Sequence, residues 1–188
     1  MEKMKVQDLM ISAERFPKIS RDATLFEALA ALEKAQGKYM SGESEQRILM
    51  IEDEKGKVVG KLSPIDLLRG LETNYNKVDM ENVLTRFGLS YMWKSMQKDY
   101  HLWENPFRDL CRKADEVRIK DFIKAPSEGQ CVSLNDSLAK CLHLFVMNRH
   151  DALFVLEGDD IVGLLRFSDV YRKVSETMKE CGVEAAKG

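Results

Sequence analysis

The chain carries the same pattern of residues twice, and this internal repeat constrains its fold more than any other feature. The first copy, within residues 6–69, contains VQDLM, KISRDATLFEALAAL and ILMIEDEKGKVVGKLSPIDLLR in that order. The second copy, within residues 119–172, contains IKDFI, CVSLNDSLAKCLHLF and ALFVLEGDDIVGLLRFSDVYR in the same order. A repeat unit of this size generally buries its apolar face against its twin. We therefore expect two small units that face each other across ligand-binding clefts.

Two offsets relate the copies. Asp8 corresponds to Asp121 at an offset of 113 (121 − 8), and Gly60 corresponds to Gly163 at an offset of 103 (163 − 60). The difference of ten residues (113 − 103) lies in a longer connection in the first copy, around KAQGKYMSGESEQR.

Composition narrows the class of protein. The 188 residues suit one compact body or two small lobes that share a core, and the 44% apolar content supports such a core. A net charge of −2 gives no general case for nucleic-acid binding. No apolar run approaches the roughly 20 residues that span a bilayer, and MEKMKVQDLM lacks a signal-peptide core. We therefore expect a cytoplasmic protein without membrane or nucleic-acid partners.

The cysteines and histidines indicate neither a disulfide framework nor a metal site. The four cysteines show no CxxC pattern, and none of the three histidines has metal-ligand spacing with a cysteine. We expect reduced thiols and no bound metal. Cys141 and His143 lie two residues apart, so on a helix they point to different faces and form no nucleophile–base pair. Packing in the core explains Cys141, and we expect His143 to face solvent.

Hydrophobic periodicity changes in the same order in both copies, which predicts strand, helix, strand, strand, helix. The first helix begins at Thr24 or Ser137, and Thr24 with Glu27 three residues on forms a capping box. Gly56 and Gly158 lie in turns between the last two strands, where a hairpin requires positive φ. The predicted strands of these hairpins are Ile48–Ile51 with Lys57–Leu62, and Ala152–Leu156 with Ile161–Leu165.

In the order and content of these motifs the chain resembles a tandem pair of cystathionine-β-synthase (CBS) domains, the arrangement called a Bateman module. The first copy carries DLM, DATLFEAL, VVG and GKLSPIDLLR, and the second carries LNDSLAKCL and IVGLLRFSDVY. The resemblance implies an α/β (α+β) fold. It predicts two β-α-β-β-α repeats packed as a pseudo-twofold pair, with a helical insert between them. We place CBS domain 1 at 3–72, the insert at 73–116 and CBS domain 2 at 117–178.

The insert has its own apolar pattern. Five apolar residues at helical spacing predict a helix over about 80–100, and Asn105-Pro106 predicts the start of another at 107–114. Both tryptophans, Trp93 and Trp103, lie in this region. Two interpretations stay open: the insert covers an exposed face of the repeats, or it forms an interface with a subunit or partner.

The first candidate site is Gly60-Lys61-Leu62-Ser63-Pro64-Ile65-Asp66. The resemblance implies that the Ser63 hydroxyl lies near the phosphates of a nucleotide and that Asp66 accepts hydrogen bonds from its ribose hydroxyls. A helix N-terminus offers free N–H groups to an anion, and a carboxylate suits two neighbouring hydroxyls. Ser63 as N-cap, Pro64 at the first position and Asp66 at the third also start a helix without a ligand. Both explanations stay open.

The second copy keeps the glycine and the aspartate, Gly163 and Asp169, so the resemblance implies a ribose contact at Asp169 as well. It has Arg166 where the first copy has Ser63. Arginine is a poor N-cap, so helix initiation does not explain it. Its guanidinium suits bidentate binding of a phosphate or of Asp169. The departure from the hydroxyl pattern is equally consistent with a closed pocket.

Further candidate ligand contacts flank the strands. Arg47 precedes the first hairpin, and Arg149 and His150 precede the second. The resemblance implies that such basic side chains face phosphates, although solvated loop charges explain each of them as well. It also implies that adenine occupies an apolar slot near Ile19 or Val132, paired with backbone groups.

The function that we expect is a non-enzymatic regulatory module, because no motif supplies a paired nucleophile and base. The resemblance implies that AMP, ADP, ATP or S-adenosylmethionine binds between the repeats, that no cofactor is required, and that a homodimer relays binding to an effector protein. The alternative is a ligand-independent scaffold whose central insert binds a partner.

Overall fold

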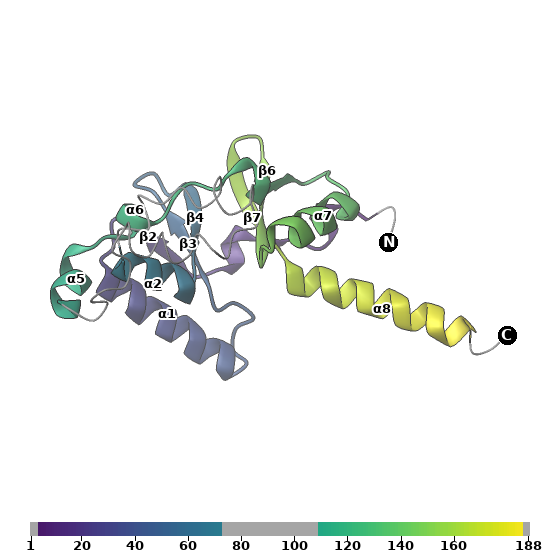
Figure 1. Ribbon diagram of the computed structural model, residues 1–188, viewed down its shortest axis with the longest axis horizontal. Coiled ribbons are helices and arrows are strands. Elements are labelled where there is room, and N and C mark those ends of the chain that lie inside the picture. Colours follow the sequence, from purple (N-terminus) through teal and green to yellow (C-terminus); the bar gives the residue numbers. More distant parts are fainter. Residues whose placement is uncertain (1–3, 73–108, 186–188) are drawn as a thin grey trace, which may run out of the picture. The chain divides into compact units, whose positions relative to one another are not determined.

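The computed structural model describes residues 4–72 and 109–185, without the side chains of residues 181–185 (Figure 1). The chain divides into two compact units. Unit 1 comprises Met1–Pro17, Lys55–Gly60 and Ala125–Gly188, and unit 2 comprises Lys18–Glu54 and Lys61–Lys124. The helix predicted over about 80–100, the first two residues of the helix predicted at 107–114, Trp93 and Trp103 lie outside the described residues.

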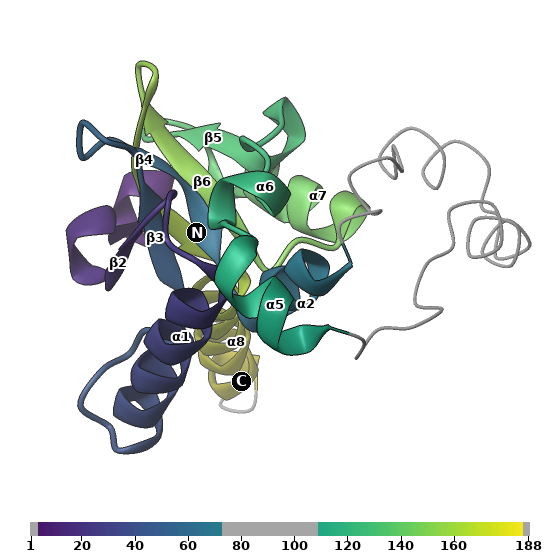
Figure 2. The same cartoon turned by 90° about the vertical axis from the view of Figure 1, so that its left-hand side faces the viewer.

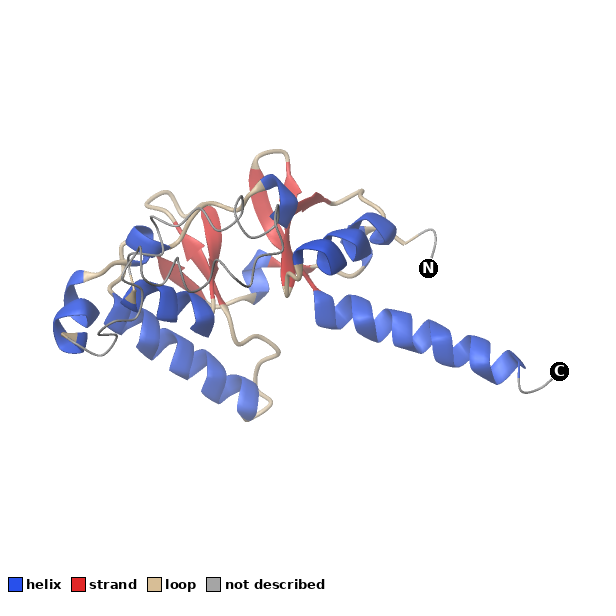
Figure 3. Ribbon diagram, in the orientation of Figure 1, coloured by secondary structure: helices blue, strands red, loops and turns tan. Residues whose placement is uncertain are grey.

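The first repeat has the predicted order of elements. They are β2 (Lys18–Ser20), α1 (Leu25–Met40), β3 (Leu49–Glu52), β4 (Val58–Leu62) and α2 (Pro64–Leu71). The strands form a sheet in the order β2-β3-β4, with β2 parallel to β3 (Figure 3). Two short helices follow the undescribed segment, α5 (Leu110–Glu116) and α6 (Ile119–Phe122). Figure 2 shows α5 beside α1.

Helix α1 begins where the sequence predicts it. The Glu27 N–H donates to Thr24 Oγ1 at 3.2 Å, and the Thr24 N–H donates to Glu27 Oε2 at 2.7 Å, so the capping box is confirmed. The buried face of the helix consists of Leu25, Ala28, Leu32 and Ala35. This spacing of three and four residues directs one stripe of the helix into the core of unit 2.

The second repeat follows the same order. Its elements are η4 (Glu128–Gln130), β5 (Cys131–Ser133), α7 (Leu138–Asn148), β6 (Ala152–Glu157), β7 (Asp160–Arg166) and α8 (Phe167–Ala185). The amino-terminal segment of the chain adds η1 (Val6–Asp8), β1 (Ile11–Ser12) and η2 (Ala13–Arg15). The sheet order is β1-β7-β6-β5, with β5 parallel to β6 and the other neighbours antiparallel.

Both predicted hairpin glycines have positive φ, +75° at Gly56 and +61° at Gly158. This is the left-handed region that glycine enters at little cost, so these predictions are confirmed. The core of unit 1 lies between α7 and the sheet and includes Val132, Cys141 and Val155. His143 is exposed, as expected. None of the helices within residues 4–72 and 109–185 is long and apolar enough to cross a membrane.

The residues at the start of each repeat are hydrogen-bonded to the start of the first helix of the other repeat. In unit 2 the Leu25 N–H donates to Val117 O at 2.8 Å, and the Ile119 N–H donates to Ala23 O at 3.0 Å. These bonds hold the chain ahead of the second repeat against the N-terminus of α1.

Unit 1 contains the equivalent bonds. The Leu138 N–H donates to Met4 O at 3.4 Å, and the Val6 N–H donates to Asp136 O at 3.0 Å. Each of these residues lies 113 positions from its equivalent in unit 2, for example 138 − 25 and 119 − 6. The two leading segments are thus exchanged between the repeats. The offset of 113 that relates the two copies in the sequence also relates the residues that form these equivalent hydrogen bonds.

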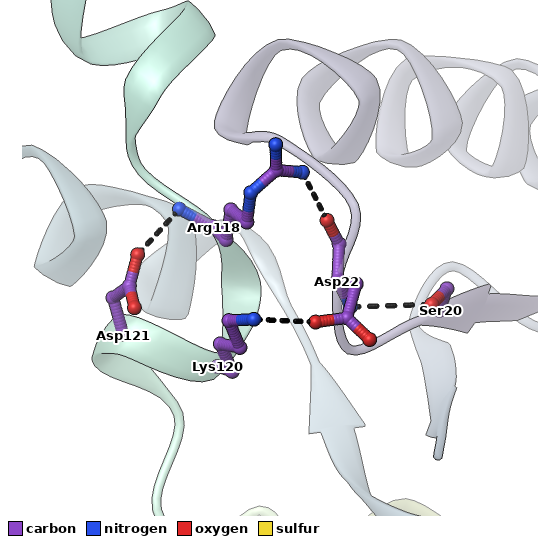
Figure 4. A network of polar contacts seen from close by, with 5 residues as sticks. All are labelled: Ser20, Asp22, Arg118, Lys120 and Asp121. Atoms are coloured by element: carbon purple, nitrogen blue, oxygen red, sulfur yellow. Dashed lines mark hydrogen bonds and ion pairs between the residues drawn. The ribbon is translucent and has the colours of Figure 1, made fainter. Parts of the chain in front are cut away.

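Side chains reinforce this exchange in unit 2 (Figure 4). Arg118 Nη1 donates to the carbonyl oxygen of Asp22, and Lys120 Nζ donates to Asp22 Oδ1, both at 2.6 Å. The hydrogen bond from Lys120 is the main cause that lowers the pKa of Asp22. Asp121 accepts from the Arg118 N–H at 2.8 Å and so begins α6. Arg118 and Lys120 therefore hold the start of the second repeat against Asp22.

Gly163 allows the close approach of β1 to β7 in unit 1. Ser12 lies opposite Gly163 in the antiparallel pair. A Cβ atom on Gly163 would lie 2.3 Å from the carbonyl oxygen of Ile11 and 2.5 Å from Cε of Met10. The glycine that the sequence singles out is therefore required by the packing of β1.

We expect Gly163→Ala to lower the free energy of unfolding by about 2–3 kcal/mol, because backbone atoms of β1 must move to admit the methyl group. Urea unfolding followed by circular dichroism measures the change. Gly37→Ala is the matched control, since nothing lies within 4 Å of the added Cβ in α1. The control should be neutral or stabilising by up to about 1 kcal/mol. Equal stability of the two variants would contradict the close contact at β1.

The cysteines of the described side chains should differ in reactivity. Burial is the main cause that raises the pKa of the Cys141 thiol to about 11, whereas Cys111 is exposed. Since the thiolate is the nucleophile, iodoacetamide at pH 8 should alkylate Cys111 in the native protein and Cys141 only after denaturation. Peptide mass spectrometry separates the two sites. Alkylation of both at similar rates in the native state would show that α7 is not packed as described.

Candidate functional site

The strand-to-helix turn of the first repeat is built around Asp66. Strand β4 ends at the fully buried Leu62, and α2 begins at Pro64, with Ser63 between them. Asp66 Oδ2 accepts two hydrogen bonds from Ser63, one from its backbone N–H at 2.9 Å and one from Oγ at 2.5 Å. The predicted helix start is therefore present, with proline at the first position and the carboxylate closing the first turn.

The second oxygen of Asp66 has a different environment. Among the residues that the structure describes, the cation that faces it is Arg69, whose Nη1 lies 3.8 Å from Oδ1. This distance exceeds that of a hydrogen bond. The Asp66 side chain is 13% exposed, so Oδ1 is partly shielded and still reachable. The turn thus combines the N–H groups of a helix start with one carboxylate oxygen that can accept from a ligand.

The equivalent turn of the second repeat is held by an ion pair. Arg166 Nε donates to Asp169 Oδ2 at 2.6 Å, and Arg166 Nη2 donates to Asp169 Oδ1 at 2.9 Å. Arg172 Nη2 also donates to Asp169 Oδ1, at 3.2 Å. Of the two partners predicted for the Arg166 guanidinium, the structure contains Asp169. The Phe167 N–H at the start of α8 donates to Asp151 O at 2.9 Å, which replaces the cap that arginine does not supply.

The predicted basic contacts occupy different environments. Arg47 is exposed, and its guanidinium carbon lies 5.9 Å from the ring centroid of Tyr39. Arg149 is exposed and ends α7 with φ of +53°, and His150 next to it is half-buried. That these three side chains face a phosphate stays a prediction.

The two predicted adenine neighbours are the central residues of edge strands. Ile19 lies in β2 and is half-buried, while Val132 lies in β5 and is 2% exposed. The Val132 side chain packs into the core of unit 1. An edge strand leaves backbone N–H and C=O groups outside the ladder, which suits pairing of adenine with the backbone. Adenine binding at either strand stays a prediction.

Within each unit the structure brings together part of the predicted set. Ser63 and Asp66 are in direct contact in unit 2, as are Arg166 and Asp169 in unit 1. Sequence reasoning missed Arg69 and Arg172. Both follow the aspartate by three residues on a helix, which is the spacing of neighbouring side chains, so the signal was present.

Among the residues that the structure describes, no group of three or more His, Cys, Asp or Glu side chains is arranged to hold a metal ion. The arrangement at both turns is a carboxylate, a helix start and an arginine, which suits binding of a polar ligand more than bond cleavage.

Comparisons with known proteins agree with this architecture. The model of the CBS domain family matches residues 6–73 and 116–176. A CBS domain-containing protein of unknown function from Bacillus anthracis is similar in structure. Its TM-score is 0.59 at 19% identity, over 93% of this chain and 95% of that one. The comparison with curated proteins gives no match.

Two other solved structures show the same fold. A hypothetical conserved protein from Geobacillus kaustophilus has a TM-score of 0.57 at 15% identity, over 94% of this chain and 99% of that one. CBSX2, solved in complex with AMP, has a TM-score of 0.51 at 15% identity, over 93% of this chain and 98% of that one. The domain limits 3–72, 73–116 and 117–178 stay a prediction beside the matched ranges. With two matched copies and the same order of elements in each, the chain belongs to the CBS domain family as a tandem pair.

Proposed function

We propose that the chain is a non-enzymatic regulatory module that binds an adenosine-containing ligand at a strand-to-helix turn and relays the binding to a partner protein. CBS domain proteins are commonly regulatory, and one protein of similar fold is described in complex with AMP. The observation that carries the proposal is that only one of the two carboxylate oxygens of Asp66 accepts hydrogen bonds from Ser63. The other oxygen faces Arg69 at 3.8 Å.

The chemistry of this turn matches a nucleoside. The two neighbouring hydroxyls of a ribose are donors, and a carboxylate is an acceptor with two oxygens. Asp66 Oδ1 can take one such donor without loss of the bonds from Ser63, so ligand binding and helix capping are compatible. The sequence leaves these two explanations open, and the geometry supports both at once.

Charge at the same turn suits a phosphate. The N-terminus of the eight-residue helix α2 carries a partial positive charge, and Arg69 adds a full charge one turn later. AMP, ADP, ATP and S-adenosylmethionine share the ribose, so the contact to Asp66 does not discriminate between them. Discrimination must come from groups near the phosphate or the sulfonium.

Exposed apolar side chains favour association with another protein chain. In unit 2, Phe26 on α1 is 59% exposed and Ile65 on α2 is 60% exposed. Large apolar groups on neighbouring helices are typical of interaction surfaces. We propose a homodimer on this basis. A ligand-independent scaffold would use the same surface, and nucleotide binding is what separates the two functions.

The test is isothermal titration of the purified protein with AMP, ADP, ATP, S-adenosylmethionine and NADH. We expect binding of an adenosine compound and a 10- to 100-fold weaker affinity in Asp66→Asn, because a hydrogen bond to a charged group contributes about 1.5–3 kcal/mol. Asp121→Asn is the matched control, since Asp121 Oδ2 accepts a capping bond at 2.8 Å in the same way but lies outside the turn.

Unchanged affinity in Asp66→Asn would refute the ribose contact. No binding across the panel by a folded protein, checked by circular dichroism, would refute the proposed function and favour the scaffold.

A further inference from the structure

Three side chains meet at each turn, a carboxylate and two of its neighbours, and one of the three differs between the repeats. At an offset of 103, Asp66 corresponds to Asp169 (169 − 66) and Arg69 corresponds to Arg172 (172 − 69). In both turns the arginine one turn along the helix approaches the same carboxylate oxygen, Oδ1. The third position has Ser63 in the first repeat and Arg166 in the second. Among the three side chains at the carboxylate, this exchange is the one difference between the turns.

The exchange changes how the carboxylate is used. In the first repeat both bonds from Ser63 go to one oxygen, Oδ2. In the second, Arg166 binds both oxygens of Asp169 in parallel, at 2.6 and 2.9 Å. This fork-on-fork geometry is the strongest that an arginine and a carboxylate form. It occupies two of the about four in-plane acceptor directions of the carboxylate, and Arg172 approaches a third, which leaves too few for two ribose hydroxyls.

Burial makes the pair hard to displace. The side chains of Arg166 and Asp169 are 21% and 12% exposed. A neutral hydroxyl that replaced one of the guanidinium bonds would leave part of a partly buried charge without its partner, which is costly. The cation beside Asp66 is Arg69, which is 61% exposed and lies 3.8 Å from Oδ1, so it competes less with a ligand for that oxygen.

We propose that Arg166 closes the second turn to nucleosides, so that the chain has one ribose-accepting turn, at Asp66, and one turn locked by an ion pair. This inference rests on the proposed function and assigns it to one repeat. Asp169 then acts in the structure of the second repeat, where it anchors the start of α8 through Arg166 and Arg172.

The test counts sites by isothermal titration with AMP. The wild-type protein should bind one AMP per chain. Arg166→Ser restores the first repeat's pattern of glycine, two residues, serine, two residues, aspartate, and should raise the count to two. The double variant Arg166→Ser/Asp169→Asn should return it to one. Arg172→Ser is the matched control, because it removes a cation from Asp169 and leaves the bidentate pair intact; its count should stay at one.

Two results would overturn the inference and leave the proposed function intact. One is a wild-type count of two per chain, and the other is a count that stays at one in a folded Arg166→Ser protein. A third measurement does not depend on that variant. Asp66→Asn in the wild-type background should lower AMP affinity at least 10-fold, and undiminished one-to-one binding would place the site elsewhere. Absence of AMP binding in the wild type, with one site gained in Arg166→Ser, would refute the function proposed for Asp66 but support closure by Arg166.

Discussion

The architecture depends on backbone hydrogen bonds that exchange the leading segments of the two repeats. Val117 accepts from the first N–H of α1, and Met4 accepts from the first N–H of α7. The first N–H groups of a helix have no partner within the helix, so each repeat satisfies one of them with the chain that leads into the other. Neither repeat is therefore complete as a continuous stretch of sequence. This explains why the compact units cross the limits of the sequence repeats.

The need to satisfy the first N–H groups of a helix also shapes the candidate site. In both repeats a strand ends and a helix begins within two residues, so the polar groups of the turn must serve the helix start first. Ser63 and Asp66 do this and leave one carboxylate oxygen available. Arg166 cannot cap a helix with its side chain, and the carbonyl of Asp151 accepts from the Phe167 N–H instead. The guanidinium is thereby left to bind Asp169, which uses both oxygens of that carboxylate. The exchange of Ser63 for Arg166 thus accompanies a different use of the carboxylate at the same strand-to-helix turn.

Much of the fold could be predicted from the sequence because local signals decide it. The capping box at Thr24 and the hairpin glycines Gly56 and Gly158 are confirmed, since each depends on residues a few positions apart. The exchange of leading segments could not be predicted, because periodicity does not report which repeat a segment packs against. Leu29 shows another limit. It belongs to the apolar spacing of α1 but is 40% exposed, because the helix presents only a narrow stripe to the core. At the site, the residue types of the turn were evident from the sequence. Which oxygens of Asp66 and Asp169 accept hydrogen bonds depends on side-chain geometry, which the sequence does not report.

The most direct test of this account is the chemical-shift change of backbone amides on titration with AMP, followed by two-dimensional NMR of the isotope-labelled protein. If the ligand binds at Asp66 and the ion pair closes the second turn, the amides of Ser63 and Asp66 should show saturable shifts, and the amides of Arg166 and Asp169 should not change. Shifts at the second turn and none at the first would contradict this expectation, because the ion pair of Arg166 and Asp169 would then not exclude the ligand.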